Sequence, residues 1–306
     1  MAMKSYRPEE LATRDLHQFI VSAIAPRPIA FVSTIDENGV QNLAPYSFFN
    51  AFSSNPPIFV FSSNRRVKGN GTKDTLHNVA ANGEVVINVV NYDIVQQMAV
   101  ASISYPADIS EFDKSGLTPI ASEYVKPARV KESPAQFECK VKEVITLGEQ
   151  GGAGHLIICE VVCMHINEDV IDERGRIDPN KIDLVGRMGR MHYVRASGAA
   201  LFTVMQDQET IGIGFDQLPK DILNSTILVG NELAQLAGQP ALPTTAEVDA
   251  LFSADPFFRN LMQSYHQEPQ ELQRQMSLYA KQLIADNQAQ TAFQVLSYAL
   301  CSKLSN

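Results

Sequence analysis

Up to about residue 198, the hydrophobic positions come in short runs that are bounded by turn residues. Runs rich in β-branched and aromatic side chains are typical of β-strands. Asn38 and Gly39 predict a tight hairpin turn between the first two runs, and the glycine-rich residues 149–154 predict a second hairpin. Because the first run is apolar on both faces, we expect a barrel wall covered outside by helices or a partner subunit. The expected strands are residues 28–35, 40–50, 56–63, 84–91, 135–148 and 155–166.

Helical spacing of apolar residues occurs in two segments of the same region. Residues 72–83 run from hydroxyl and carboxylate side chains to a terminal glycine, and residues 93–104 open on Asp93. Each segment therefore predicts a helix. Residues 105–135 are interpreted as a loop that is long enough to be functional or to wrap a neighbouring subunit.

The pattern changes after residue 198. Over residues 199–306 the apolar positions follow helical spacing, which predicts four or five helices. Thr244 and Glu247 match a capping box at the start of one of them. We therefore expect an α+β fold, with a mainly β domain at residues 1–198 and an all-α region at residues 199–306.

The composition is that of a globular protein. The chain has 306 residues, of which 45% are hydrophobic and 19% are charged, and its net charge is −9. This acidic balance argues against non-specific binding to nucleic acid or to anionic membranes. The apolar residues 19–32 are interrupted by Arg27 and two prolines and are preceded by acidic residues. We therefore expect neither a signal peptide nor a membrane span, and we interpret the protein as cytoplasmic.

One stretch of this acidic chain gathers positive charge. Residues 62–75, SSNRRVKGNGTKDT, combine four cations with two glycines and several hydroxyl side chains, directly before an expected helix. Free N–H groups at the start of a helix favour anions, so this stretch predicts a phosphate site that includes Lys73. A solvated surface loop is the alternative interpretation of the same residues.

A second candidate lies just after the first hairpin. Residues 43–53, LAPYSFFNAFS, could present backbone polar groups to the edge of a flat ring and apolar side chains to its face. The alternative is a simple core strand. Thr34 and Asn42 stand on either side of the hairpin turn, as hydrogen-bond donors to a ligand or as ordinary polar strand residues.

Cysteine and histidine give weaker signals. Cys163 and His165 share a strand face and, with Cys139 on a neighbouring strand, could suggest a metal site. Because no CxxC spacing supports a metal, we interpret the cysteines as core residues and expect no metal site. His192 could donate a proton or contact a nicotinamide, but a structural hydrogen bond is the favoured interpretation, and no catalytic side chain is assigned.

Six blocks between about residues 18 and 195 carry a resemblance to a known family. They are PRPIAFVSTIDENGVQNLAPYSFFN, NPPIFVFSS, KDTLHN before GEVVINVV, SEFDKSGL, KESPAQFEC and GRMGRMHY. In these blocks and their order the chain resembles the flavin reductase-like, FMN-binding split-barrel family, which includes flavoredoxin and the reductase components of two-component monooxygenases. The resemblance implies a split β-barrel and FMN as the cofactor.

The resemblance also implies roles for particular residues. Ala44 to Phe49 would line the isoalloxazine, and Ser62 with Ser63 would reach the ribityl chain or the phosphate. Residues 73–75 would hold the phosphate, with Asp74 as a helix cap, and one of two adjacent arginines would assist. The implied cofactor-binding residues are Thr34, Asn42, Ala44, Pro45, Tyr46, Ser47, Phe48, Phe49, Ser62, Ser63, Arg65, Lys73, Asp74 and Thr75.

The activity implied by the resemblance is transfer of a hydride from NAD(P)H to flavin, in which the protein stacks and orients the ring and needs no acid–base residue. A non-catalytic FMN-binding electron carrier of flavoredoxin type is the alternative. A third, weaker alternative is a flavin-binding scaffold whose helical C-terminal region is the interaction surface. The expected partners are NAD(P)H, flavin, a second copy of the chain, and a monooxygenase or electron-transfer protein.

Overall fold

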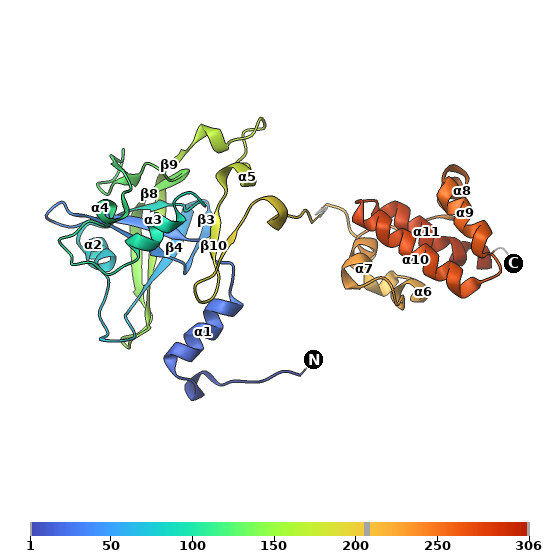
Figure 1. Ribbon diagram of the computed structural model, residues 1–306, viewed down its shortest axis with the longest axis horizontal. Helices are drawn as coiled ribbons and strands as arrows, with labels where there is room; N and C mark the ends of the chain where they lie inside the picture. The colour runs from blue at the N-terminus through green and yellow to red at the C-terminus, as the bar shows by residue number, and fades with distance from the viewer. Residues whose placement is uncertain (1, 205–208, 305–306) are drawn as a thin grey trace. The chain divides into compact units, whose positions relative to one another are not determined.

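The structure, a computed structural model, describes residues 2–204 and 209–304. The chain folds as two compact units, Met1–Thr203 and Val204–Asn306. In Figure 1 the first unit runs from blue to yellow and the second from orange to red. Each unit has its own hydrophobic core.

A seven-stranded antiparallel sheet forms the first unit, with the strand order β2-β1-β5-β8-β9-β4-β3. Gly39 closes the first hairpin at a φ of 88°, which is the left-handed conformation that glycine adopts without strain. The expected α+β fold is confirmed. The strands are β1 Ala30–Ile35, β2 Gln41–Tyr46, β3 Phe49–Ser54, β4 Pro57–Asn64, β5 Glu84–Asn88, β8 Ala135–Thr146 and β9 Gly154–Ile166, with the short pairs β6 Pro119–Ile120 and β7 Arg129–Val130, and β10 Val185–Arg187 and β11 Tyr193–Arg195.

Both faces of β1 are buried, as the sequence predicts. Val32 belongs to the core inside the sheet, together with Phe61 and Ile157. Phe31 faces the other way and packs with Met98 and Phe112, so helices cover this wall from outside. The helices of this unit are α1 Thr13–Ala23, α2 Asp74–Asn82, α3 Val95–Ala101, α4 Glu111–Ser115 and α5 Pro179–Ile182, with single 3-10 turns at Pro8–Glu10, Glu168–Val170 and Gly198–Ala200.

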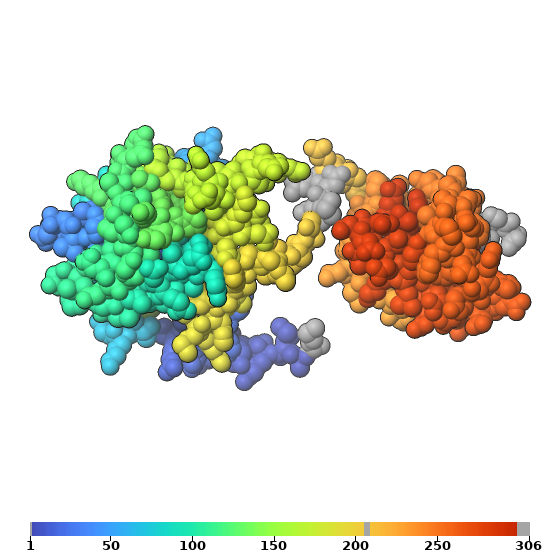
Figure 2. Space-filling view, turned by 45° about the horizontal axis from the view of Figure 1, so that its top comes forward, coloured from blue at the N-terminus to red at the C-terminus, as the bar shows by residue number. Residues whose placement is uncertain are grey.

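The structure differs from the sequence prediction at several elements, among them α5 and the β10–β11 pair, which were not predicted. The expected strand 40–50 is broken, because β2 ends at Tyr46 and β3 turns back to pair with β4. The expected loop 105–135 contains α4 and the β6–β7 pair. The apolar residues 19–32 contain the end of a helix, α1, which lies beside the segment 186–195 (blue and yellow in Figures 1 and 2).

The second unit is entirely helical. Its core includes Leu236, Phe258 and Phe293. Thr244 and Glu247 form the expected capping box at the start of α8. Its described residues contain one short helix more than expected, and no helix in residues 2–204 or 209–304 has the length and apolarity needed to span a bilayer. The helices are α6 Lys220–Leu223, α7 Gly230–Ala237, α8 Thr245–Ala254, α9 Pro256–Tyr265, α10 Pro269–Ala285 and α11 Ala289–Leu304, with a 3-10 turn at Phe215–Gln217.

Candidate functional site

A pocket of about 460 Å³ opens on the first unit, within the size range of small-molecule sites. Four segments form its walls: α1, residues 45–48 at the bend between β2 and β3, the end of β4 with Lys73, and residues 187–190. Six residues that the sequence predicts as cofactor contacts lie in this lining. They are Pro45, Tyr46, Ser47, Phe48, Ser62 and Lys73.

A smaller pocket of about 40 Å³ shares Pro45 and Lys73 with the large one. It contains four more of the predicted residues and the buried carboxylate of Glu111. Ten of the fourteen predicted residues therefore line one pocket or the other. The four additional predicted residues are Asn42, Ala44, Asp74 and Thr75.

Lys73 stands at the start of α2, between the two pockets. It occupies the N-cap position, and its side chain makes no hydrogen bond to the first turn. The prediction that Asp74 caps this helix is wrong, because Asp74 is already the first helical residue. The Lys73 ammonium lies 4.5 Å from the centre of the Tyr46 ring, and burial followed by the nearby Arg66 lowers the pKa of Lys73. An anion bound at this helix start would raise the pKa of Lys73 and so counteract the effects of burial and of Arg66.

Four buried polar side-chain atoms of the first unit lack a hydrogen bond of good geometry among the described residues. They are Tyr46 Oη, Ser63 Oγ, Arg65 Nε and His155 Nε2. Ser63 pairs with His155 across β4 and β9, and the Tyr46 hydroxyl lies close to Ser63. Burial raises the pKa of Tyr46 to about 12. Tyr46 lies within hydrogen-bonding reach of both Thr75 and Ser63, so these hydroxyls form a buried polar group behind the pocket.

A hydrogen-bonded network lies behind the smaller pocket. The Thr34 hydroxyl accepts from Asn78 and donates to Asn42, and Thr75 also donates to Asn42. The structure therefore brings Thr34, Asn42 and Thr75 together, but Thr34 is fully buried and lines neither pocket. Its contacts are those of a residue that orients Asn42.

Glu111 completes this network and was missed by the sequence analysis. Its carboxylate accepts from Asn42 Nδ2 at 3.0 Å and from the Leu43 N–H at 2.9 Å. Burial raises the pKa of Glu111. Glu111 lies in the expected loop 105–135, where the apolar residues show no helical or strand periodicity. The block SEFDKSGL, which contains Glu111, was the one sequence signal that could have identified it.

Three further predicted residues lie outside both pockets. Phe49 packs edge-on against Phe59, with ring centres 5.9 Å apart, and Arg65 donates to the Asn70 carbonyl. Ser63 points into the interior beside Tyr46. His192 is exposed and also outside the pockets; its main-chain groups bond to those of Gly189 and Met188.

Arg27 is the organising residue that the sequence analysis treated only as an interruption of an apolar run. Its guanidinium is 6% exposed and donates to the carbonyls of Val21, Ile24 and Met188 and to Ser47 Oγ. Three walls of the large pocket are thus tied to one side chain. Burial, and secondly the Arg187 guanidinium, lowers the pKa of Arg27.

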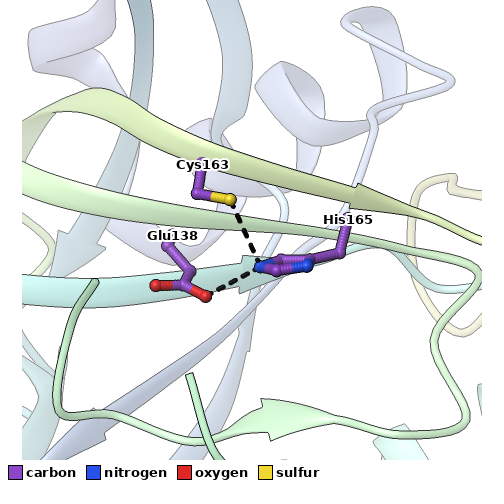
Figure 3. Close-up of side chains that lie close together, drawn as sticks. All are labelled: Glu138, Cys163 and His165. Carbon is purple, nitrogen blue, oxygen red and sulfur yellow. Dashed lines mark hydrogen bonds and ion pairs between the residues drawn. The ribbon is translucent and has the colours of Figure 1, made fainter. Parts of the chain in front are cut away.

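Figure 3 shows Glu138, Cys163 and His165, whose donor atoms lie within 4.8 Å of one another. The Glu138 carboxylate accepts from three backbone N–H groups, at residues 123–125, and lies 2.8 Å from His165 Nε2. Burial raises the pKa of Cys163, which keeps the thiol protonated. Cys139, the third member of the metal hypothesis, lies in the core instead. These contacts identify Glu138 as the anchor of the 123–125 segment.

The comparisons with known proteins concern the first unit. The sequence matches the family described as Flavin reductase like domain over residues 22–185. An uncharacterized protein of Aquifex aeolicus is 34% identical over 183 residues, which are 60% of this chain and 91% of that protein.

Two solved structures share both fold and sequence with this chain. Nitrilotriacetate monooxygenase component B from Bacillus cereus is 32% identical, with a TM-score of 0.62 over 67% of this chain and all of that one. A putative flavin reductase with split barrel domain from Shewanella frigidimarina is 27% identical, with a TM-score of 0.56 over 66% of this chain and all of that one. Because the family match spans more than half of the sequence, the chain belongs to the flavin reductase-like family, and its first unit is a split barrel.

Proposed function

We propose that this chain is an FMN-binding flavin reductase that transfers a hydride from NAD(P)H to flavin. The observation that carries the proposal is that an open pocket and the start of α2 meet at Lys73, a cation that lines the pocket and stands at the uncapped end of the helix. Membership of the flavin reductase-like family supports the same reading.

The residues around Lys73 fit a phosphate monoester. Lys73 and the first-turn N–H groups of α2 would hold the dianion, while Ser62, which lines the large pocket, would contact its oxygens or the ribityl chain. The backbone of residues 44–49 would contact the polar edge of the ring. When bound, the flavin supplies the site that accepts the hydride.

The chain's own groups orient the ligands rather than transfer protons. Ser47 Oγ accepts from Arg27, which leaves the Ser47 proton free to be donated into the pocket. The Phe48 ring lines this side of the pocket, and its centre lies 6.0 Å from the Arg27 guanidinium. No Asp or Glu occurs among the described residues that line the large pocket, and His17 is its one histidine there.

The flavin assignment is tested by replacing Lys73 with alanine. We expect the affinity for FMN to fall by about 1.5–3 kcal/mol, because a charge-assisted contact to the phosphate is lost, while the affinity for riboflavin is unchanged. Titration of the flavin fluorescence measures both. Lys68→Ala is the matched control, since Lys68 lies in the same loop but lines neither pocket. If FMN and riboflavin lost affinity equally, the proposal that Lys73 binds the phosphate would be contradicted.

The activity itself is tested by following oxidation of NADH and NADPH in the presence of FMN. Turnover with at least one nucleotide supports the reductase, whereas oxidation of neither favours the alternative of a flavoredoxin-type electron carrier. The likeness to a monooxygenase component supports a further proposal, that a monooxygenase partner receives the reduced flavin. A cytoplasmic location stays a prediction that cell fractionation would test.

A further inference from the structure

The large pocket is strongly cationic although the chain carries a net charge of −9. No carboxylate occurs among its described lining residues to balance this charge. A concave surface of one sign concentrates ligands of the opposite sign. The cations that line it are Arg14, Arg27, Lys73, Arg187 and Arg190.

Two glycines bring the arginines of separate segments together. A Cβ on Gly189 would overlap the Ser22 hydroxyl and lie 3.2 Å from Ser22 Cα, so only glycine lets the segment 187–190 approach α1 this closely. Gly186 is similarly tight, with a virtual Cβ 3.0 Å from Pro26. The motif GRMGRM therefore sets Arg187 and Arg190 beside the helix that carries Arg14.

These arginines have no counter-ions in the described part of the chain. Arg14, Arg187 and Arg190 form no ion pair there. The Arg187 guanidinium instead donates to the Arg190 carbonyl and stacks 4.5 Å from the centre of the Tyr193 ring. Such stacking holds the planar donor fork in one orientation, which suits bidentate recognition of phosphate.

One phosphate does not account for all of this charge. Under the proposed function, Lys73 and the start of α2 take the phosphate of FMN. Arg14, Arg187 and Arg190 then remain for a second anionic group that enters the same pocket. A nicotinamide dinucleotide brings a diphosphate, and NADPH adds a ribose 2′-phosphate, for which nearby arginine is the usual protein partner.

We propose that Arg14, Arg187 and Arg190 bind the phosphates of NADPH, including the 2′-phosphate, and make the chain select NADPH over NADH. The inference rests on the proposed function and adds its electron donor. Three arginines exceed what the two charges of a diphosphate require, and the 2′-phosphate supplies the missing negative charge. Arg14 and Arg190 are exposed members of the pocket lining, so a long ligand that extends out of the pocket could contact both.

The test compares kcat/KM for NADPH and for NADH in the full chain, in Arg14→Ala and in Arg190→Ala. We expect the wild type to prefer NADPH by about tenfold or more, the ratio that one charge-assisted contact contributes. In each variant kcat/KM for NADPH should fall while kcat/KM for NADH stays the same, so the preference is lost. The affinity for FMN should be unchanged. Arg174→Ala, an exposed arginine outside the pocket, is the control. Equal use of both nucleotides by the wild type, or equal losses for both in the variants, would overturn the inference.

A binding measurement separates this inference from the proposed function. Calorimetry with 2′,5′-ADP and with 5′-ADP on the flavin-loaded full chain probes the 2′-phosphate without any turnover. Tighter binding of 2′,5′-ADP that depends on Arg190 supports the site even if neither nucleotide is oxidised. Equal affinity for the two probes contradicts it, and points to a ligand that carries only a diphosphate, such as FAD or NADH.

Discussion

Glu111 is a buried carboxylate, and its hydrogen-bond donors, the Asn42 amide and the Leu43 N–H, are uncharged. One of its oxygens accepts from both Asn42 and Leu43, so the side chain fixes the strand that forms one wall of the smaller pocket. Burial disfavours the charged form and raises the pKa of Glu111, and nearby Asp74 adds to this effect. The folded protein therefore binds the proton of Glu111 more tightly than the unfolded chain does.

This difference predicts how stability depends on pH. A raised pKa in the folded state means that the contribution of Glu111 is greatest below its unfolded value of 4.5 and is lost as pH rises through the folded value. Glu111→Gln keeps an oxygen acceptor and cannot ionise. We expect the free energy of unfolding of the wild type, relative to the variant, to fall as pH rises from 4.5. Urea unfolding of both proteins at several pH values measures this, and parallel curves would contradict it.

At the scale of elements, α1 is held by a few specific contacts rather than by a core. None of its residues is fully buried. Its C-terminal end is fixed by Arg27, and its side meets the segment 187–190 at Ser22 and Gly189. A helix held in this way is sensitive to single atoms at the contact.

The contact predicts the effect of Gly189→Ala. The added methyl group overlaps Ser22, so we expect a loss of about 1–3 kcal/mol in the free energy of unfolding and faster proteolysis within α1. Ser22→Ala in the same chain should recover part of the loss, because it removes the closest atom. Gly71→Ala serves as the control, since no atom lies within 4 Å of its virtual Cβ. A variant as stable as the wild type would show that α1 is not packed as described.

The elements differ in how well the sequence predicts them. The hairpins and α2 follow from local patterns, since turn residues and helix starts act within a few positions. The break between β2 and β3 does not, because the apolar run continues through it and only pairing with β4 reveals it. The same holds within the site: Lys73 lies in a charged cluster that can be read locally, whereas Arg27, Arg187 and Arg190 are brought together by the fold.

At the scale of the whole molecule, the two units have separate cores. Every buried residue of the helical core lies between Leu218 and Leu296, and the cores of the first unit use none of them. The family match also ends at residue 185, before the helical unit begins. A domain with its own core is expected to fold alone.

We therefore expect residues 1–203, produced without the helical unit, to fold and to bind FMN as tightly as the full chain.

We also propose that the first unit forms a homodimer, because β9 exposes Val162 and Met164 to solvent. Light scattering should give twice the chain mass for both proteins, and Met164→Glu should yield monomers. Met3→Glu, at another exposed methionine, is the control. A monomeric full chain would contradict the dimer, and an unfolded fragment would contradict the independence of the units.

The four hydrogen bonds that Arg27 donates to Val21, Ile24, Ser47 and Met188, here called the Arg27 clamp, have a consequence for variation among related sequences. Three of its four acceptors are main-chain oxygens, which every amino acid provides. Positions 21, 24 and 188 can therefore change side chain while the clamp persists. A lysine at position 27 has a single nitrogen and cannot span acceptors in three segments at once. Mutational scanning should find one intolerant position surrounded by permissive ones.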